Sequence, residues 1–164
     1  MKIRPAVAGD DAEVAGIYDH HVLNSTATFD TRPLGTQPWT DMIDKADPTR
    51  PVLVAVTGGE IAGFAYASDF RHRPAYTGTR ETSVYIEPQH VGLGMGRLLY
   101  NELLSQLRAE GVHAVIAAVG EPNPASSSLH SACGFRRIGT MPEIGYKLGR
   151  WVDVTWWELV LARV

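Results

Sequence analysis

The chain has 164 residues, of which 45% are hydrophobic, and this length suits one domain with its own hydrophobic core. Its 15 Lys and Arg against 18 Asp and Glu give a formal net charge of -3 without a basic block, which argues against a nucleic-acid partner. No apolar run approaches membrane-spanning length, the N-terminus lacks a signal-peptide pattern, and the single cysteine, Cys133, excludes an intrachain disulfide. We therefore expect a cytoplasmic protein with one domain over residues 1–164.

Hydrophobic periodicity and turn residues predict the elements of the N-terminal half. In chain order these are a strand Lys2–Val7, a helix from Asp10 to about His21, a surface loop Asn24–Pro33, a helix capped by Thr36 that ends before Asp47, and two strands, Val52–Thr57 and Ile61–Ser68, joined by Gly58 and Gly59. The next segment, Asp69–Thr79, is rich in cations and aromatic residues and has no periodicity, so we expect an irregular loop.

The second half alternates strands and helices. We expect a strand Thr82–Glu87, a helix from Gly94 to Glu110, a strand His113–Val119, a short helix Pro124–Cys133, and two strands, Phe135–Met141 and Trp151–Leu161, with a turn at Gly149 and Arg150 before the last. The order β, α, α, β, β, β, α, β, α, β, β predicts an α/β (α+β) fold, a mixed sheet with helices on both faces.

Three alternate glycines, Gly92, Gly94 and Gly96, stand where the predicted strand gives way to the long helix. Because they lack side chains, several backbone N–H groups can point the same way at the helix start, where phosphate groups bind. The turn is not a Walker loop, since no Gly-Lys-Ser/Thr follows. A dinucleotide fingerprint needs the third glycine one residue later, and its acidic residue should end a second strand, whereas Glu110 ends a helix.

The strand, the turn Pro88–Gly96 and the following helix resemble the GCN5-related N-acetyltransferase (GNAT) superfamily over most of the chain. That family has Pro, two residues, Arg or Gln, and then three alternate glycines; here Val91 takes the Arg or Gln position. Gln89–Gly94 fits the short pattern two residues earlier. We prefer the later register because the spacing from Gly96 to the helix then matches the family.

A second family pattern, an Asn, a short helix and then Gly-Phe, matches Asn123–Phe135 and puts His130 at the position of the general acid. This His, Glu81 before the central strand, and the tail from Gly145 narrow the resemblance to the phosphinothricin and methionine sulfoximine acetyltransferases. Those enzymes acetylate the α-amine of glutamate-like compounds and are homodimers. The resemblance implies the same small-molecule amine and the same assembly here.

The resemblance also implies the GNAT fold, a mixed and mostly antiparallel sheet of about seven strands with a splay between the two central strands, flanked by about four helices. Acetyl-CoA is the implied co-substrate. Its implied binding residues are Val84, Tyr85, Ile86, Val91, Gly92, Leu93, Gly94, Met95, Gly96, Arg97, Asn123 and Ser126.

Amide formation from a thioester needs a neutral amine, a polarised carbonyl and a proton for the departing thiolate. A carboxylate near the α-ammonium meets the first need, and Glu81 resembles the family base. In the family a backbone N–H of the strand polarises the carbonyl, and the resemblance implies that this N–H lies within Val84 to Ile86 here. His130, with an ordinary pKa of roughly 6.5, would protonate the thiolate.

For a carboxylate-bearing acceptor, guanidinium groups are the expected partners because they pair with a carboxylate or phosphinate through two hydrogen bonds. The candidate acceptor residues are Phe29, Arg71, Arg73, Tyr76 and Glu81. The histidines show no metal-ligand spacing, and we expect no metal. Cys133 is expected in the core, and Trp151, Trp156 and Trp157 in the core or a dimer interface.

Two alternatives stay open at this point. A ribosomal-protein or other peptide α-amine, or another small amine, could be the acceptor, although the loop Asp69–Thr79 looks able to close over a small molecule. A regulatory acyl-CoA-binding module without catalysis is the other; Glu81 and His130 together argue against it.

Overall fold

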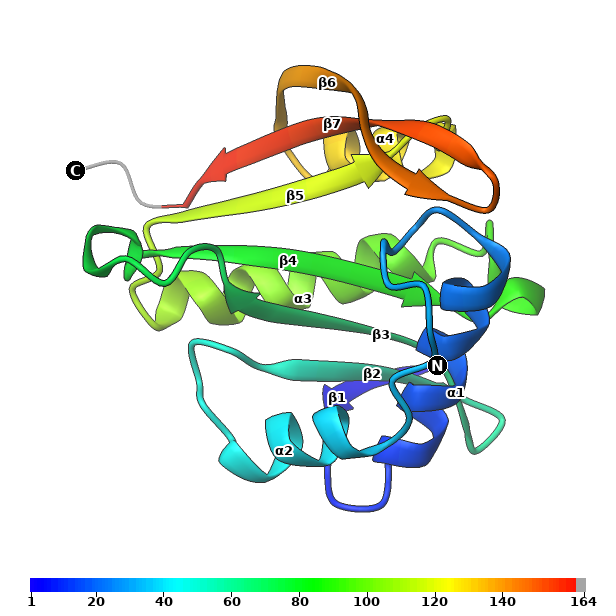
Figure 1. Cartoon of the computed structure of the whole chain (residues 1–164). Coiled ribbons are helices and arrows are strands. Elements are labelled where there is room, and N and C mark those ends of the chain that lie inside the picture. Colours follow the sequence, from blue (N-terminus) through cyan, green and yellow to red (C-terminus); the bar gives the residue numbers. More distant parts are fainter. Residues whose placement is uncertain (162–164) are drawn as a thin grey trace.

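The computed structural model describes residues 1–161, which form one twisted seven-stranded sheet with two helices on each face (Figure 1). Its strands are β1 (Lys2–Pro5), β2 (Val52–Thr57), β3 (Glu60–Asp69), β4 (Thr79–Ile86), β5 (Ala114–Gly120), β6 (Arg136–Lys147) and β7 (Arg150–Val160). Its helices are α1 (Asp11–Asn24), α2 (Gln37–Lys45), α3 (Met95–Ala109) and α4 (Pro124–Ala132), with 3₁₀ turns at Pro74–Tyr76 and Pro88–His90.

The strand order is β1-β2-β3-β4-β5-β7-β6, and each neighbouring pair is antiparallel except β4 and β5. The parallel pair shares only three positions, from Thr79 opposite Ala114 to Glu81 opposite Ile116, and the two strands then diverge (Figure 1). The predicted α/β fold, with its mostly antiparallel sheet and its central splay, is confirmed.

Two cores lie on the two faces of the sheet, as the alternation of apolar residues along the strands requires. On one face α1 and α2 pack through Val14, Tyr18 and Trp39 against Phe64 and Tyr85. On the other, the apolar side of α3 packs with the sheet and with Phe135 and Trp157; its fully buried residues are Leu99, Tyr100, Leu103 and Leu107. Each central strand is therefore covered on both sides.

Several element boundaries differ from the sequence predictions. β4 begins at Thr79, not at Thr82, so Glu81 lies inside the strand rather than at its mouth. β6 continues to Lys147, past the predicted end at Met141, because the ladder with β7 resumes after an irregularity between Met141 and Gly145. The turn before β7 is formed by Leu148 and Gly149. Within residues 1–161, no helix combines the length and the apolar character needed to cross a membrane.

Candidate functional site

A cavity of about 480 Å³ opens where β4 and β5 diverge. It runs from the backbone of β4 to the glycine turn before α3 and to the first turns of α4. Its lining residues include Val84, Ile86, Gly92, Gly94, Gly96, Arg97, Tyr100, Ala118, Gly120, Asn123, Ser126 and His130. The splay thus creates a long slot between two strands that are elsewhere buried.

The backbone groups of β4 alternate between β3 and this cavity. Glu87 donates its N–H to Ala62 of β3 at 3.0 Å, whereas the carbonyl of Gly78 accepts from His113, just before β5, at 2.9 Å. Since the N–H and C=O of one residue in an antiparallel pair point to the same side, the even-numbered residues of β4 face β5. Beyond Glu81 they face the cavity, because β5 has moved away.

Side chains cover two of these carbonyls and leave the middle residue facing the cavity. The Tyr100 hydroxyl oxygen lies 3.2 Å from the carbonyl oxygen of Thr82. Nε2 of His21 lies 3.0 Å from the carbonyl of Ile86. Between them, the N–H and C=O of Val84 are available to a ligand that lies along β4 as an added strand would.

The glycine turn gives α3 an N-terminus with free backbone donors. Gly92 and Gly94 have φ angles of +85° and +77°, which favour glycine, and Gly94 is the N-cap. The helix ladder begins with the N–H of Leu98, which donates to the carbonyl of Gly94 at 3.3 Å. The N–H groups of residues 95–97 therefore precede the ladder, and all three residues line the cavity. Such an end attracts anions.

The start of α4 forms the opposite wall. Asn123 caps the helix with Oδ1, which accepts from the N–H of Ser126 at 3.0 Å, and Pro124 occupies the first turn. This cap fixes Asn123 and Ser126 at the cavity wall and puts His130 one turn further along the same helix face.

His130 is 3% exposed and packs among three aromatic rings, with Trp157 stacked at 5.9 Å. Nδ1 lies 2.7 Å from the carbonyl of Ser126, which can only accept, and Nε2 lies 3.0 Å from the Tyr100 hydroxyl. Burial lowers the pKa of His130 despite the bond to Ser126. The expectation of an ordinary pKa is therefore wrong: the neutral imidazole donates from Nδ1 and accepts the Tyr100 proton at Nε2.

Glu81 is half-buried where β4 and β5 still pair. Burial raises the pKa of its carboxyl, and the positive charge of Arg71 partly opposes this. A carboxylate that is costly to keep charged is a better proton acceptor than an exposed one.

Phe70 organises the segment that follows β3. The guanidinium of Arg71 lies 4.7 Å from the centre of its ring, and the rings of Tyr76 and Trp156 lie 5.6 Å and 6.3 Å away. Phe70 therefore joins the loop after β3 to β7 across the two central strands. Arg71, Arg73 and Tyr76 are exposed on the same loop.

Residues 14–135 match the acetyltransferase (GNAT) family. The chain belongs to this family. Among characterised relatives, it is 41% identical to a phosphinothricin N-acetyltransferase of Streptomyces viridochromogenes, over 96% of this chain and 86% of the relative. It is 36% identical to an L-methionine sulfoximine/L-methionine sulfone acetyltransferase of Salmonella typhimurium, over 98% of this chain and 95% of the relative.

The fold of this GNAT protein has close counterparts among solved structures. A Salmonella typhimurium acetyltransferase, solved with its cofactor acetyl-CoA, superposes with a TM-score of 0.95 at 35% identity, covering 99% of this chain and 95% of the other. The chain is thus an N-acetyltransferase by family, with a fold similar to that of this solved acetyltransferase.

The structure brings most of the predicted acetyl-CoA residues of this GNAT chain to one cavity. Those that line it are Val84, Tyr85, Ile86, Val91, Gly92, Gly94, Met95, Gly96, Arg97, Asn123 and Ser126. Leu93 is not among them and its side chain is 68% exposed. Among residues 1–161, no three His, Cys, Asp or Glu side chains gather closely enough to hold a metal ion.

The predicted acceptor residues do not gather within one copy of the chain. Glu81 and Arg71 lie where β4 and β5 pair, whereas the Phe29 ring packs against Gly120 and Gly145. Gly120 lies four residues beyond the β5 partner of Glu81, or roughly 13 Å at about 3.3 Å per residue. Phe29 therefore borders the open end of the splay.

Sequence reasoning missed four residues at this site: His21, Phe70, Tyr100 and Trp156. Tyr100 follows Gly96 by one helical turn, so the helix pattern could have indicated that it faces the same wall. His21 and Trp156 come from distant elements, and nothing local to their sequence marks them.

Proposed function

We propose that residues 1–164 act as a single N-acetyltransferase domain that transfers acetyl from acetyl-CoA directly to the α-amine of a small amino-acid-like substrate. Phosphinothricin, methionine sulfoximine and methionine sulfone are the acceptor type that the names of the relatives support. The observation that carries the proposal is the slot between β4 and β5, which runs from the free N-terminus of α3 to Thr82, the residue after the half-buried Glu81.

Acetyl-CoA would lie along the slot. Its pyrophosphate would accept hydrogen bonds from the free N–H groups before α3, with the positive end of the helix dipole behind them. Its pantetheine arm would pair with β4 at Val84, as an added strand does. Val91 offers no polar side chain, so the backbone would supply the contacts of the turn.

The transfer itself needs two groups on β4. Glu81 would take a proton from the acceptor ammonium, directly or through a water molecule, and the free amine would attack the thioester carbonyl. The N–H of Val84 would donate to the oxygen as it becomes negative. The C–S bond then breaks and the nitrogen loses its second proton, which leaves an N-acetyl product and a thiolate.

Protonation of the thiolate would involve His130 together with Tyr100. Because the neutral imidazole holds the proton of the Tyr100 hydroxyl, the two side chains form a short path that ends at the cavity wall. The proton that the acetylated nitrogen loses can be taken up at Nε2 of His130 and pass through the Tyr100 hydroxyl to the sulfur, which prevents the thiolate from reversing the reaction.

The acceptor would bind on the side of Glu81, with its carboxylate or phosphinate paired to Arg71 or Arg73 and its apolar part near Tyr76. Phe29 of the same copy borders the other end of the splay and would not contact it. The exposed positions of these arginines suit a binding loop that orders around its substrate.

We further propose a cytoplasmic homodimer. A group of large apolar side chains is exposed along β6 and β7, namely Ile138, Met141, Ile144, Tyr146, Leu148 and Trp151, each at least 49% exposed. Several large apolar side chains exposed on an edge strand and its neighbour are typical of a protein interface. A molecular mass of about 36 kDa in sedimentation equilibrium, twice the chain mass of 17.9 kDa, would support the dimer.

An acceptor screen tests the proposed activity. Purified protein with acetyl-CoA should release CoA thiol with methionine sulfoximine, methionine sulfone or phosphinothricin, and the product should gain one acetyl group. Common amino acids, polyamines and a peptide complete the panel. Turnover with the peptide alone would refute the small-acceptor proposal, and tight acetyl-CoA binding without turnover of any amine would favour a binding module. Resistance of producing cells to phosphinothricin would show whether the activity can protect a host.

A further inference from the structure

Arg80 is a buried cation directly beside the proposed base, and its side chain is only 8% exposed. Neighbouring side chains of a strand point to opposite faces, so Arg80 does not share the acceptor side with Glu81. A buried guanidinium is costly unless its donors are paired, which means that its partners reveal what it does.

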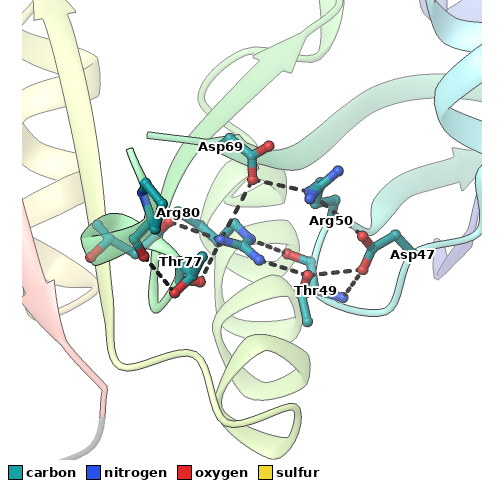
Figure 2. Close-up of polar contacts among 8 residues, drawn as sticks. Asp47, Thr49, Arg50, Asp69, Thr77 and Arg80 are labelled. Carbon is teal, nitrogen blue, oxygen red and sulfur yellow. Dashed lines mark hydrogen bonds and ion pairs between the residues drawn. The ribbon is translucent and has the colours of Figure 1, made fainter. Parts of the chain in front are cut away.

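Those partners come from three separate segments (Figure 2). From the connection between α2 and β2, the carbonyl and the hydroxyl of Thr49 accept from Nε at 2.9 Å and from Nη2 at 2.8 Å. From the start of β4 and the turn before it, the carbonyls of Thr77 and Thr79 each accept from Nη1 at 3.0 Å. At the end of β3, the Asp69 carboxylate lies 3.6 Å from Nη1.

Both ends of this arrangement are themselves fixed. Thr49 donates its N–H and its hydroxyl to the Asp47 carboxylate at 2.8 Å each. Thr77 donates its N–H at 3.1 Å and its hydroxyl at 2.9 Å to the carbonyl of Pro74, and the N–H of Tyr76 donates to Arg73 at 2.9 Å. Through Thr77, Arg80 therefore holds the turn Pro74–Tyr76 and the flanking Arg73.

We propose that Arg80 is the positioning residue of the acceptor site: its guanidinium ties the loop Phe70–Gly78 to the rigid connection before β2 and so sets where Arg71, Arg73 and Tyr76 meet the substrate. The inference rests on the proposed function, since it assigns this loop to the acceptor. A lysine at position 80 keeps the charge but carries a single ammonium group on a flexible stem. It cannot bond to the three carbonyls that the rigid planar guanidinium reaches at once.

The test is Arg80→Lys, with Arg50→Met as the matched control. Arg50 belongs to the same cluster and pairs with Asp69 at 3.1 Å, but its side chain is 43% exposed and has no bond to the acceptor turn. Arg80→Lys should raise the acceptor KM at least about tenfold, because it removes several charge-assisted hydrogen bonds. The dissociation constant of acetyl-CoA should change less than about twofold, and Arg50→Met should change neither.

Trypsin provides a readout that does not depend on activity. Within the loop it can cut after Arg71, since Arg73 is followed by Pro74. A loosened loop should be cut there about tenfold faster in Arg80→Lys than in the wild type, because the cleavage rate follows the population of the open form. Thr49→Val, which removes one acceptor of the guanidinium, should shift both readouts in the same direction and carries the test if Arg80→Lys does not fold.

The two proposals fail separately. Absence of turnover with every amine would refute the proposed function, while the rate of cleavage after Arg71 would still decide whether Arg80 holds the loop. An unchanged acceptor KM and an unchanged cleavage rate would overturn the role of Arg80. Equal weakening of acetyl-CoA and acceptor binding would do the same, because it would mark Arg80 as a general stability residue.

Discussion

Replacing Gly94 by alanine tests the structure of the proposed pyrophosphate site. At φ +77° an alanine is strained by roughly 1–2 kcal/mol, although the new Cβ would meet no atom within 4 Å. The strain is relieved if the turn before α3 changes conformation and the N–H groups point elsewhere. Acetyl-CoA binding must then restore the strained turn, so its affinity should fall about 5–30-fold.

Isothermal titration with CoA and inhibition by pantetheine, which lacks the pyrophosphate, separate this effect from a general loss of structure. Gly94→Ala should weaken CoA and leave pantetheine nearly unchanged. Gly58→Ala is the matched control. Gly58 has φ +62°, and a Cβ added there also meets no atom within 4 Å. It lies in the hairpin between β2 and β3 and does not line the cavity. It should lose similar stability without losing CoA affinity.

Val91→Ala gives a second control, because the Val91 side chain is 57% exposed and offers no polar contact. Equal CoA affinity in Gly94→Ala and wild type would refute the proposal that backbone N–H groups of the turn bind the pyrophosphate. So would a loss of CoA affinity no larger than in Val91→Ala, or equal losses for CoA and pantetheine.

The other predictions concern the transfer step and the open end of the splay. Because burial raises the pKa of Glu81 and only the charged form accepts a proton, kcat/KM should rise with pH through that raised pKa, and Glu81→Gln should remove this limb of the profile and slow turnover about 10²–10⁴-fold. His130→Phe should fit among the surrounding rings and lower kcat more than it weakens acetyl-CoA binding; unchanged turnover would remove His130 from the mechanism. Gly145→Ala would overlap the Phe29 ring and push it outward, which should lower the free energy of unfolding by about 1–3 kcal/mol, whereas Gly139→Ala on the same strand, with no atom within 4 Å of the new Cβ, should leave thermal unfolding unchanged.

A buried lysine shows how the loop at the open end is held. Lys147 is 4% exposed, and its Nζ donates to the carbonyl of Thr28 at 2.6 Å. Burial lowers the pKa of Lys147, opposed by the charge of Asp30. Thr28 belongs to the loop after α1, 119 residues earlier in the chain, so β6 and this loop stabilise one another. The position of Phe29 beside Gly145 depends on that pairing.

Some features could be predicted from the sequence because they depend only on residues within a few positions of one another. The glycine turn can be predicted because Gly92 and Gly94 adopt left-handed conformations, which any other residue would adopt only with strain. The start of α4 is marked by Asn123 and Pro124, a cap and a first-turn residue that act within a few positions of one another. Alternating apolar residues predicted the strands that the structure contains, since their two faces meet two cores.

Features that depend on residues far away in the chain could not be predicted from the sequence. β4 begins at Thr79 because residues 79–81 pair with β5, which follows more than 30 positions later. Arg80 directly precedes Glu81 in the sequence, but the direction of its side chain is decided by Thr49, Asp69 and Thr77.

By itself, the sequence determined the order of elements and the anion-binding turn, because backbone preference and hydrophobic period act over short distances, whereas Glu81 and His130 became candidates through the resemblance to the GNAT family. Only the tertiary structure decided that the pKa of His130 is lowered and that the pKa of Glu81 is raised. The pKa of a side chain depends on the water it loses and on the charges it meets, and burial by Tyr100, Ser126 and the central strands exists only once the chain has folded.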